Sequence, residues 1–89
     1  MPTISFTRAL ERFLAAPFAK VEGATVGDAF NAVFASRSVL RGYVLDDQGA
    51  LRRHVIVYVN GRPVNDRVQL TDLVGPRDEI YVFQALTGG

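Results

Sequence analysis

The residues of this chain best suited to chemistry are the last four, Leu86-Thr87-Gly88-Gly89. Gly88 and Gly89 lack a Cβ atom, so this part of the chain can thread a narrow channel and approach a partner closely. A carboxylate at Gly89 would be shielded by no side chain, but a carboxylate is a poor electrophile. It would need activation, and an acyl-adenylate made from ATP by a partner enzyme is the form that fits best. The tail thus predicts acyl chemistry carried out in the active site of another protein.

The paired glycines also have bland explanations, which are chance, a frayed end of the chain or residues left by an expression vector. A vector remnant usually brings further linker residues, and none are visible beside Gly88 and Gly89. We therefore treat residues 86–89 as a flexible functional tail and the residues before it as the domain that presents it.

Composition limits the classes of function. The 89 residues suffice for one domain with a modest core. The net charge of +1 comes from nine arginines and one lysine against nine acidic residues, so we expect neither a nucleic-acid partner nor an anionic membrane. Cysteine is absent, so any sulfur that the protein handles must sit on its carboxy terminus. The sequence contains no run of about 18 apolar residues, so it predicts no membrane-spanning helix. We expect a cytoplasmic protein.

The first half of the chain predicts two strands and a helix. Ile4 and Phe6 begin an alternating pattern typical of a strand, and Leu10 is a candidate to continue it. Residues 11–17 fit either a loop or a short helical turn, and residues 19–24 predict a second strand that Gly23 ends. A helix should begin after Thr25, whose hydroxyl can cap it, and end near Ser36 to Ser38. Its buried face is predicted to consist of Val26, Ala29, Phe30, Val33 and Phe34.

The second half predicts a hairpin, a loop and a final strand. Residues 42–53 are a connection with a turn at residues 46–49, and residues 54–59 are the strongest strand pattern. Asn60-Gly61 is a strong hairpin signal, and Pro63 places the short return strand 62–64 at an edge. Residues 65–78 are expected to form a loop with one helical turn at residues 70–73. A last strand over residues 79–85 leads into the tail.

This order of elements indicates an α+β domain over residues 1–85, followed by the tail at residues 86–89. It predicts a mixed sheet of four to five strands with one main helix packed on one face. If the first and last strands are adjacent and parallel, the domain has the β-grasp, ubiquitin-like fold.

Strand periodicity predicts which side chains of the sheet face a partner. Ile80 and Val82 should face the helix, which leaves Tyr81 and Phe83 on the open face. On the neighbouring strand, Ile56 and Tyr58 should point the same way. Tyr58 and Phe83 would then form an exposed aromatic patch beside the tail, suited to a protein interface. The alternative is that the tyrosines only cover the edge of the core, and a register slip would exchange the two faces.

Other polar residues favour structural roles. The adjacent Asp46 and Asp47 beside Gly49 are typical of a solvated turn rather than a metal site. Arg52 and Arg53 could meet an acidic partner, although solvated arginines are the simpler account. His54 has no Cys, Asp or Glu at ligand spacing. Because no nucleophile-base pair, phosphate loop or ligand cluster is visible, we expect a carrier or binding protein rather than an enzyme, with no metal and no bound cofactor.

The β-grasp pattern, the Tyr58-Val59-Asn60-Gly61 hairpin and the terminal Gly88-Gly89 resemble the ubiquitin-like sulfur carriers of the MoaD/ThiS family. Within this family, the stretch from Gly49 to Gly61 looks most like the carriers of cysteine synthesis. The resemblance covers most of the chain, and its tail and hairpin are the specific features.

The resemblance implies a cycle and a set of partners. An adenylating enzyme of the ubiquitin-activating type would use ATP to activate Gly89, and a sulfur donor would convert it to a thiocarboxylate. A synthase would then accept the sulfur for cysteine, molybdopterin or thiamin. Gly88 would provide clearance, and Leu86 and Thr87 would guide the tail into the partner. The protein would be a monomer alone and a heteromer with its partner.

Two other functions fit the same residues. Gly89 could instead be joined to lysines of target proteins, as in ubiquitin-like modifiers, because the activation chemistry is shared. The single lysine, Lys20, argues weakly against chains of the modifier. A non-covalent binding module with incidental glycines is the third possibility, and it would be insensitive to removal of Gly89.

Overall fold

The computed structural model describes residues 1–6 and 18–84, with the backbone alone described at residues 18, 19 and 84. The predictions made for Leu10, for residues 11–17 and for the tail fall outside the described part of the chain. The elements are β1 (Thr3–Phe6), β2 (Phe18–Lys20), α2 (Val26–Ser36), α3 (Ser38–Val44), β3 (Val55–Val59), β4 (Arg62–Pro63) and β5 (Glu79–Gln84).

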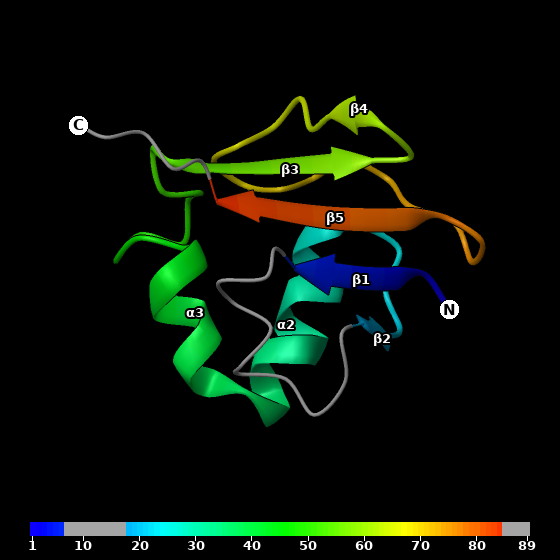
Figure 1. The fold of residues 1–89 in the computed structure, drawn as a ribbon, viewed down its shortest axis with the longest axis horizontal. Helices are drawn as coiled ribbons and strands as arrows, with labels where there is room; N and C mark the ends of the chain where they lie inside the picture. Colours follow the sequence, from blue (N-terminus) through cyan, green and yellow to red (C-terminus); the bar gives the residue numbers. More distant parts are fainter. Residues whose placement is uncertain (7–17, 85–89) are drawn as a thin grey trace.

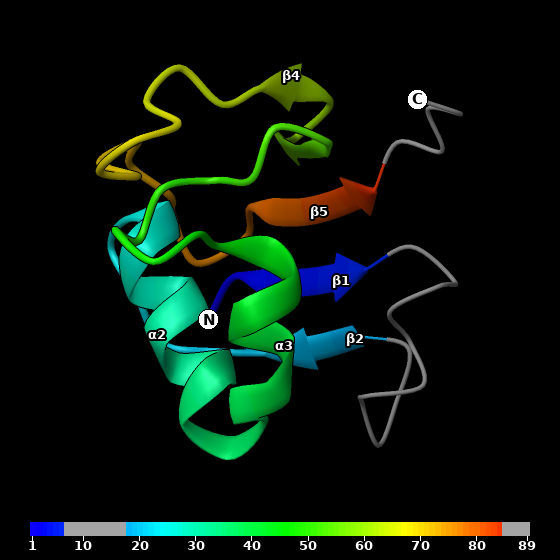
Figure 2. The ribbon, with the colours of Figure 1, turned by 90° about the vertical axis from the view of Figure 1, so that its left-hand side faces the viewer.

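These strands form one five-stranded mixed sheet in the order β2-β1-β5-β3-β4 (Figure 1). β1 and β5 pair in parallel, with Ile4 opposite Ile80, whereas the other neighbouring strands pair in antiparallel fashion. The two helices lie together against the sheet (Figure 2). The first and last strands are therefore adjacent and parallel, which confirms the predicted α+β class and β-grasp fold.

α2 begins and ends where its sequence signals predict. The Thr25 hydroxyl accepts a hydrogen bond from the Asp28 backbone N–H at 3.1 Å, which satisfies one of the free donors of the first turn. The Asp28 carboxylate accepts from the Ala24 N–H at 3.3 Å, one residue before the position that a longer glutamate would reach in a capping box. The five residues predicted for its buried face are all buried.

The sequence prediction of a connection over residues 42–53 was wrong in its first part, because α3 occupies Ser38–Val44. α3 is short, its N-cap residue Arg37 makes no side-chain capping bond, and Gly42 lies within it. Its local signals are therefore weak. Tertiary packing stabilises it instead, since Leu40 and Val44, one turn apart, are completely buried in the common core. The predicted turn at residues 46–49 is confirmed by a hydrogen bond from Gly49 N–H to the Asp46 carbonyl at 3.0 Å.

β2 is shorter than predicted. It ends at Lys20 instead of extending to residue 24, although the Val21 N–H still donates to the Pro2 carbonyl at 3.0 Å. Gly23 then passes against the first turns of α2, where a Cβ would lie only 2.8 Å from the Ala29 nitrogen. This close approach directs the chain away from the sheet and into the helix.

The hairpin turn fixes the start of β5 as well as the end of β3. Asn60 and Gly61 both have positive φ, 53° and 83°, as a type I′ turn requires. The Asn60 side chain accepts from the Glu79 N–H at 2.9 Å and donates to the Asp78 carboxylate at 2.8 Å. This bridge from the hairpin holds β3 and β5 in register, and β4 lies at the edge of the sheet as Pro63 predicts.

The loop before β5 does not contain the predicted helical turn at residues 70–73. The turn lies earlier, at residues 67–69, where the Asp66 carboxylate accepts from the Val68 and Gln69 N–H groups and from the Thr71 hydroxyl. Leu70 has a φ of 58°, which ends the turn. The carbonyls of Leu70 and Asp72 accept hydrogen bonds from the first N–H groups of α2. They are therefore bonded to the helix and not to a helical turn within the loop.

The core lies between the sheet and the two helices. Ile4, Val55, Val57, Ile80 and Val82 are completely buried on the helix side, together with the apolar faces of α2 and α3. Tyr81 and Phe83 alternate with these residues along β5 and remain 39% and 40% exposed. The predicted side-chain parity of β5 is therefore confirmed.

The hydrogen bonds of Asp66 predict a dependence of stability on pH. Its hydrogen bond from Thr71, followed by those from the backbone, lowers the pKa of Asp66 from 3.8 to about 2. A lowered pKa means that the carboxylate stabilises the fold above pH 3.8 and loses this effect as the pH falls towards 2. At neutral pH we expect a higher free energy of unfolding for the wild type than for Asp66→Asn. This difference should disappear as the pH falls from 3.8 to about 2. Urea unfolding of both proteins across the range measures it, and a difference independent of pH would contradict the assignment.

The parity of β5 predicts opposite effects for neighbouring substitutions. Ile80→Ala removes fully buried atoms and should lower the free energy of unfolding by about 2–5 kcal/mol. Tyr81→Ser removes a side chain from the open face and should cost about 1 kcal/mol, mainly through its ring contact with Phe83. Urea unfolding at neutral pH distinguishes the two. A larger loss for Tyr81→Ser than for Ile80→Ala would show that the faces had been exchanged.

Candidate functional site

The predicted reactive tail follows the central strand of the sheet. β5 is flanked by β1 on one side and β3 on the other, and its last residue, Gln84, pairs with Val55 at the beginning of β3. Leu86, Thr87, Gly88 and Gly89 are outside the described residues, so their roles stay predictions. The described structure shows what surrounds the point from which the tail departs.

The open face of the sheet presents four apolar side chains near this point, and we call them the sheet-face patch: Ile56, Tyr58, Tyr81 and Phe83. Phe83 lies opposite Ile56 and Tyr81 opposite Tyr58, so the two pairs share one face. The rings of Tyr81 and Phe83 are 6.4 Å apart, while Ile56 and Tyr58 are half-buried. All four predicted residues are thus brought together.

The register sets how the patch is arranged. Tyr58 lies directly opposite Tyr81, so Tyr58 and Phe83 are diagonal neighbours on the same face. The cause is the Asn60 bridge, which aligns Val59 with Ile80 and thereby sets every later pair. A stretch of apolar and aromatic side chains on this face remains the expected form of a protein interface.

Two arginines and a histidine lie just beyond the patch, in the turn that precedes β3. The Val55 N–H donates to the Arg52 carbonyl at 3.0 Å, so Arg52, Arg53 and His54 belong to this turn and not to the strand. The Arg52 Nε donates to the Gly42 carbonyl at the exposed side of α3, at 2.7 Å, whereas Arg53 is exposed. The end of the sheet at which the tail departs therefore carries positive charge.

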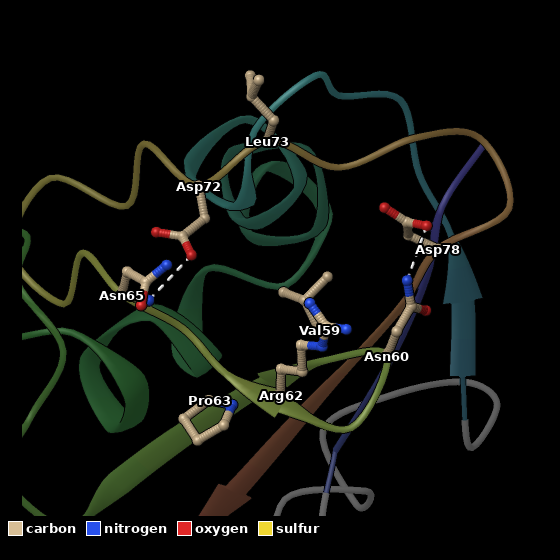
Figure 3. Close-up of a pocket in the computed structure, with 8 residues that line it drawn as sticks. All are labelled: Val59, Asn60, Arg62, Pro63, Asn65, Asp72, Leu73 and Asp78. Carbon is tan, nitrogen blue, oxygen red and sulfur yellow. Dashed lines mark hydrogen bonds between the residues drawn. The ribbon is translucent and has the colours of Figure 1, made fainter.

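A hollow lies at the other end of the sheet, beside the hairpin (Figure 3). Its volume is about 1010 Å³, and it is lined by Val59, Asn60, Arg62, Pro63, Asn65, Asp72, Leu73 and Asp78. Apart from the hairpin residues, the residues that line this hollow carry no site signal in the sequence. The lining residues come from three separate segments, so no local sequence pattern could have identified them as a group.

The carboxylates of this hollow are occupied by the chain itself. Asp72 accepts from the Asn65 and Asp66 N–H groups, both at 2.9 Å. Asp78 accepts from the Gly75 N–H at 2.7 Å and from Asn60, and these bonds lower the pKa of Asp78. Both carboxylates thus have a structural role, because they hold backbone N–H groups of the loop before β5. The patch near the tail, rather than this hollow, is the better candidate for function, because the predicted reactive tail follows the strand that carries it.

The described residues offer neither a metal centre nor a membrane span. In residues 1–6 and 18–84, no group of three or more His, Cys, Asp or Glu side chains is arranged to hold a metal ion. Asp46 and Asp47 lie in the turn after α3, where the Asp46 carboxylate accepts from the Gln48 and Ala50 N–H groups. No helix within the same ranges has the length and apolar character needed to cross a bilayer.

Comparison with solved structures shows the same fold in several proteins. A chain of the Amycolatopsis orientalis BexX/CysO complex matches with a TM-score of 0.88 and 23% identity over all of both chains. Haloferax volcanii SAMP1 matches with a TM-score of 0.83 and 26% identity over 99% of this chain and 98% of its own. Mycobacterium tuberculosis CysO matches with a TM-score of 0.85 and 22% identity over 97% and 100% of the two chains.

Comparison with curated proteins finds no match. The model of the ThiS family, however, matches residues 12–89, which include β3, the Asn60-Gly61 turn, β5 and both terminal glycines. The chain therefore belongs to the ThiS family, as its resemblance to the ubiquitin-like sulfur carriers predicts.

Proposed function

We propose that this protein is a sulfur carrier that acts as a co-substrate of partner enzymes and is not itself an enzyme. The observation that carries the proposal is the ThiS family match, which extends over both terminal glycines. The position of the tail after the central strand supports it, because a strand held on both sides is a firm base from which to present a reactive end. The protein would supply no cofactor, and ATP would be consumed by the activating partner.

The proposed cycle uses the Gly89 carboxylate. One of its oxygens attacks the α-phosphorus of ATP in the adenylating partner, which releases pyrophosphate and leaves an acyl-adenylate. A sulfur donor then displaces AMP at the acyl carbon and forms the thiocarboxylate. A synthase accepts the sulfur for cysteine, molybdopterin or thiamin. The stretch from Gly49 to Gly61 favours the cysteine pathway.

The sheet-face patch is the proposed docking surface for both partners. It lies on the two strands that meet at the departure point of the tail, so a partner bound there would have Gly88 and Gly89 within reach of its active site. Leu86 and Thr87 would guide the tail. A CysO of the same fold is found in complex with BexX, and we infer by analogy that this chain also assembles with a partner.

A second candidate is a ubiquitin-like modifier joined through Gly89 to lysines of target proteins. The 26% identity to SAMP1, which is a small archaeal modifier protein, favours this candidate. The acyl-adenylate would be the same, but an amine of the target would displace AMP in place of sulfur. The two functions therefore differ in the product found on Gly89.

The product on Gly89 is the direct test. We expect intact-mass measurement of the protein from its own host, grown under sulfur demand, to show one oxygen replaced by sulfur, and fragmentation to place the change at Gly89. A variant lacking Gly89 is the control and should carry no sulfur. Gly89 found on target lysines with no thiocarboxylate would establish the modifier. If neither the thiocarboxylate nor the lysine conjugate forms, even with ATP and host extract supplied, the protein is a non-covalent binding module.

If the sheet-face patch is the docking surface, substitutions of two exposed apolar residues should affect the rate of activation differently. Phe83→Asp should slow ATP-dependent activation by about tenfold or more, because it puts a charge into the contact surface. Leu73→Asp is the matched control, since Leu73 is 79% exposed but lies at the hollow on the opposite end of the sheet. The measurement is thiocarboxylate formation by mass in host extract with ATP and sulfide. Equal rates for both variants and the wild type would refute docking at the patch.

A further inference from the structure

The Asn60-Gly61 turn carries the dipeptide of this chain best suited to a spontaneous reaction of the chain with itself. The chain has three asparagines, and only Asn60 precedes a glycine. A backbone nitrogen that follows asparagine can attack the side-chain carbonyl carbon, and glycine favours this attack because no Cβ hinders the approach. Both residues are exposed, and a Cβ on Gly61 would meet no described atom within 4 Å. Water and open space are thus available at the turn.

The reaction is a deamidation in two steps. The Gly61 nitrogen forms a bond to the Asn60 Cγ, its proton passes through water to the side-chain nitrogen, and this nitrogen leaves as ammonia. The product is a five-membered succinimide. Water then adds to one of the two ring carbonyls and breaks the bond from that carbon to the ring nitrogen. The residue at position 60 becomes an aspartate, or an isoaspartate whose backbone runs through the side-chain carbon. Water is the only other reactant.

The native turn holds the two reacting atoms apart. Asn60 and Gly61 have φ values of 53° and 83°, as in a type I′ turn. Such a turn has a ψ of roughly +30° at its first central residue, which places the following nitrogen about 150° around the Cα–C bond from Cβ. Closure of the succinimide ring requires these two atoms to be nearly eclipsed. The Gly61 nitrogen and the Asn60 side chain therefore lie on opposite sides of this bond.

Three hydrogen bonds hold Asn60 in this geometry. Its side-chain oxygen accepts from the Glu79 N–H at 2.9 Å, and its backbone N–H donates to the Glu79 carbonyl at 2.9 Å. Its side-chain amide donates to the Asp78 carboxylate at 2.8 Å (Figure 3). Rotation of the side chain towards Gly61 would break the two bonds that the side chain makes. Although the turn is exposed, its opening therefore requires that the hairpin separate from β5 at this end.

Deamidation would remove the donor of the bond to Asp78. The modified side chain has an oxygen in place of the amide nitrogen, so two carboxylates would face each other where a hydrogen bond now joins Asn60 and Asp78. Hydrogen bonds from the Gly75 N–H and then from Asn60 lower the pKa of Asp78, so its carboxylate is ionised at neutral pH. An isoaspartate would also add one atom to the backbone of the turn, which the two-residue type I′ geometry does not accommodate.

We propose that Asn60 is a latent modification site, which the turn geometry and the Asn60 bridge protect from deamidation and which unfolding exposes. The modified residue cannot rebuild the bond to Asp78, so a molecule that has lost this amide would refold with a weakened join between the hairpin and β5. Because the bridge also sets the pairing of β3 with β5, the change would impair the sheet-face patch. Neither step involves the tail, so the site is independent of the proposed function.

The first test measures deamidation at position 60 of the full chain by peptide mapping and mass, at mildly alkaline pH. We expect the wild type to react roughly tenfold or more slowly in buffer than in concentrated urea, because native opening of the turn is rare. A synthetic peptide of residues 57–64, incubated in both solvents, corrects for any direct effect of urea. Asn31 and Asn65 are internal references, since neither precedes a glycine. Equal corrected rates in the two solvents would overturn the proposal.

A second test separates the bridge from global stability. Asp78→Ala removes the acceptor of the Asn60 side-chain amide. Val33→Ala is the matched control, because it destabilises the fold from the buried face of α2 and leaves the turn unchanged. In buffer, we expect position 60 to deamidate several-fold faster in Asp78→Ala than in Val33→Ala. Equal rates, or a faster reaction in Val33→Ala, would show that global unfolding alone governs the reaction and would refute protection by the bridge.

A third test concerns the consequence of the modification. Asn60→Asp reproduces the aspartate product and should lower the urea midpoint of unfolding at neutral pH. The double variant Asn60→Asp/Asp78→Asn exchanges donor and acceptor, so an amide at position 78 can donate to the carboxylate at position 60. It should recover most of the loss, with Asp78→Asn alone as the reference. An unchanged midpoint for Asn60→Asp, or no recovery in the double variant, would contradict the proposed effect on the bridge.

Discussion

The structure depends on the parallel pairing of β1 with β5. These strands come from opposite ends of the described chain, and their pairing places β5 between β1 and β3, where its backbone is bonded on both sides. Parallel neighbours cannot be joined by a tight turn, so the chain between them must cross over one face of the sheet. α2 and α3 make that crossing, and they cover the face on which Ile80 and Val82 are buried. The opposite face stays open, and this is where the sheet-face patch lies.

This arrangement separates the stable part of the molecule from the part that would react. Along β5, the fully buried side chains of Ile80 and Val82 contribute to the core, and the exposed side chains of Tyr81 and Phe83 contribute to the patch. Backbone pairing with β1 and β3 holds the strand, and the Asn60 bridge adds hydrogen bonds at its beginning, at the end away from the tail. A partner could therefore bind the patch and draw on the tail without disturbing the contacts that hold the domain together.

Much of this could be predicted from the sequence, because strong local signals agreed with the tertiary structure. The valine-rich strand before Asn60-Gly61, the Thr25 cap and the alternation along β5 all lie where they were expected. α3 was not predicted because its local signals are weak, and it is stabilised by the burial of Leu40 and Val44 in the common core. The turn in the loop was displaced because the Asp66 carboxylate stabilises residues 67–69, while the Leu70 and Asp72 carbonyls bond to α2. The pairing of Tyr58 with Tyr81 required the register, which depends on a bridge between distant residues.

The central place of β5 also has a consequence for the making of the protein. A chain leaves the ribosome from its amino terminus, and domains fold as units during or after synthesis. Because β5 comes last among the described strands and fills the middle of the sheet, β1 and β3 have no common neighbour until it emerges. A nascent chain truncated before Glu79 would lack the buried side chains of Ile80 and Val82 and could not close the core. Folding of the domain thus requires that β5 has been translated, and only molecules that already possess the central strand would present the patch to a partner.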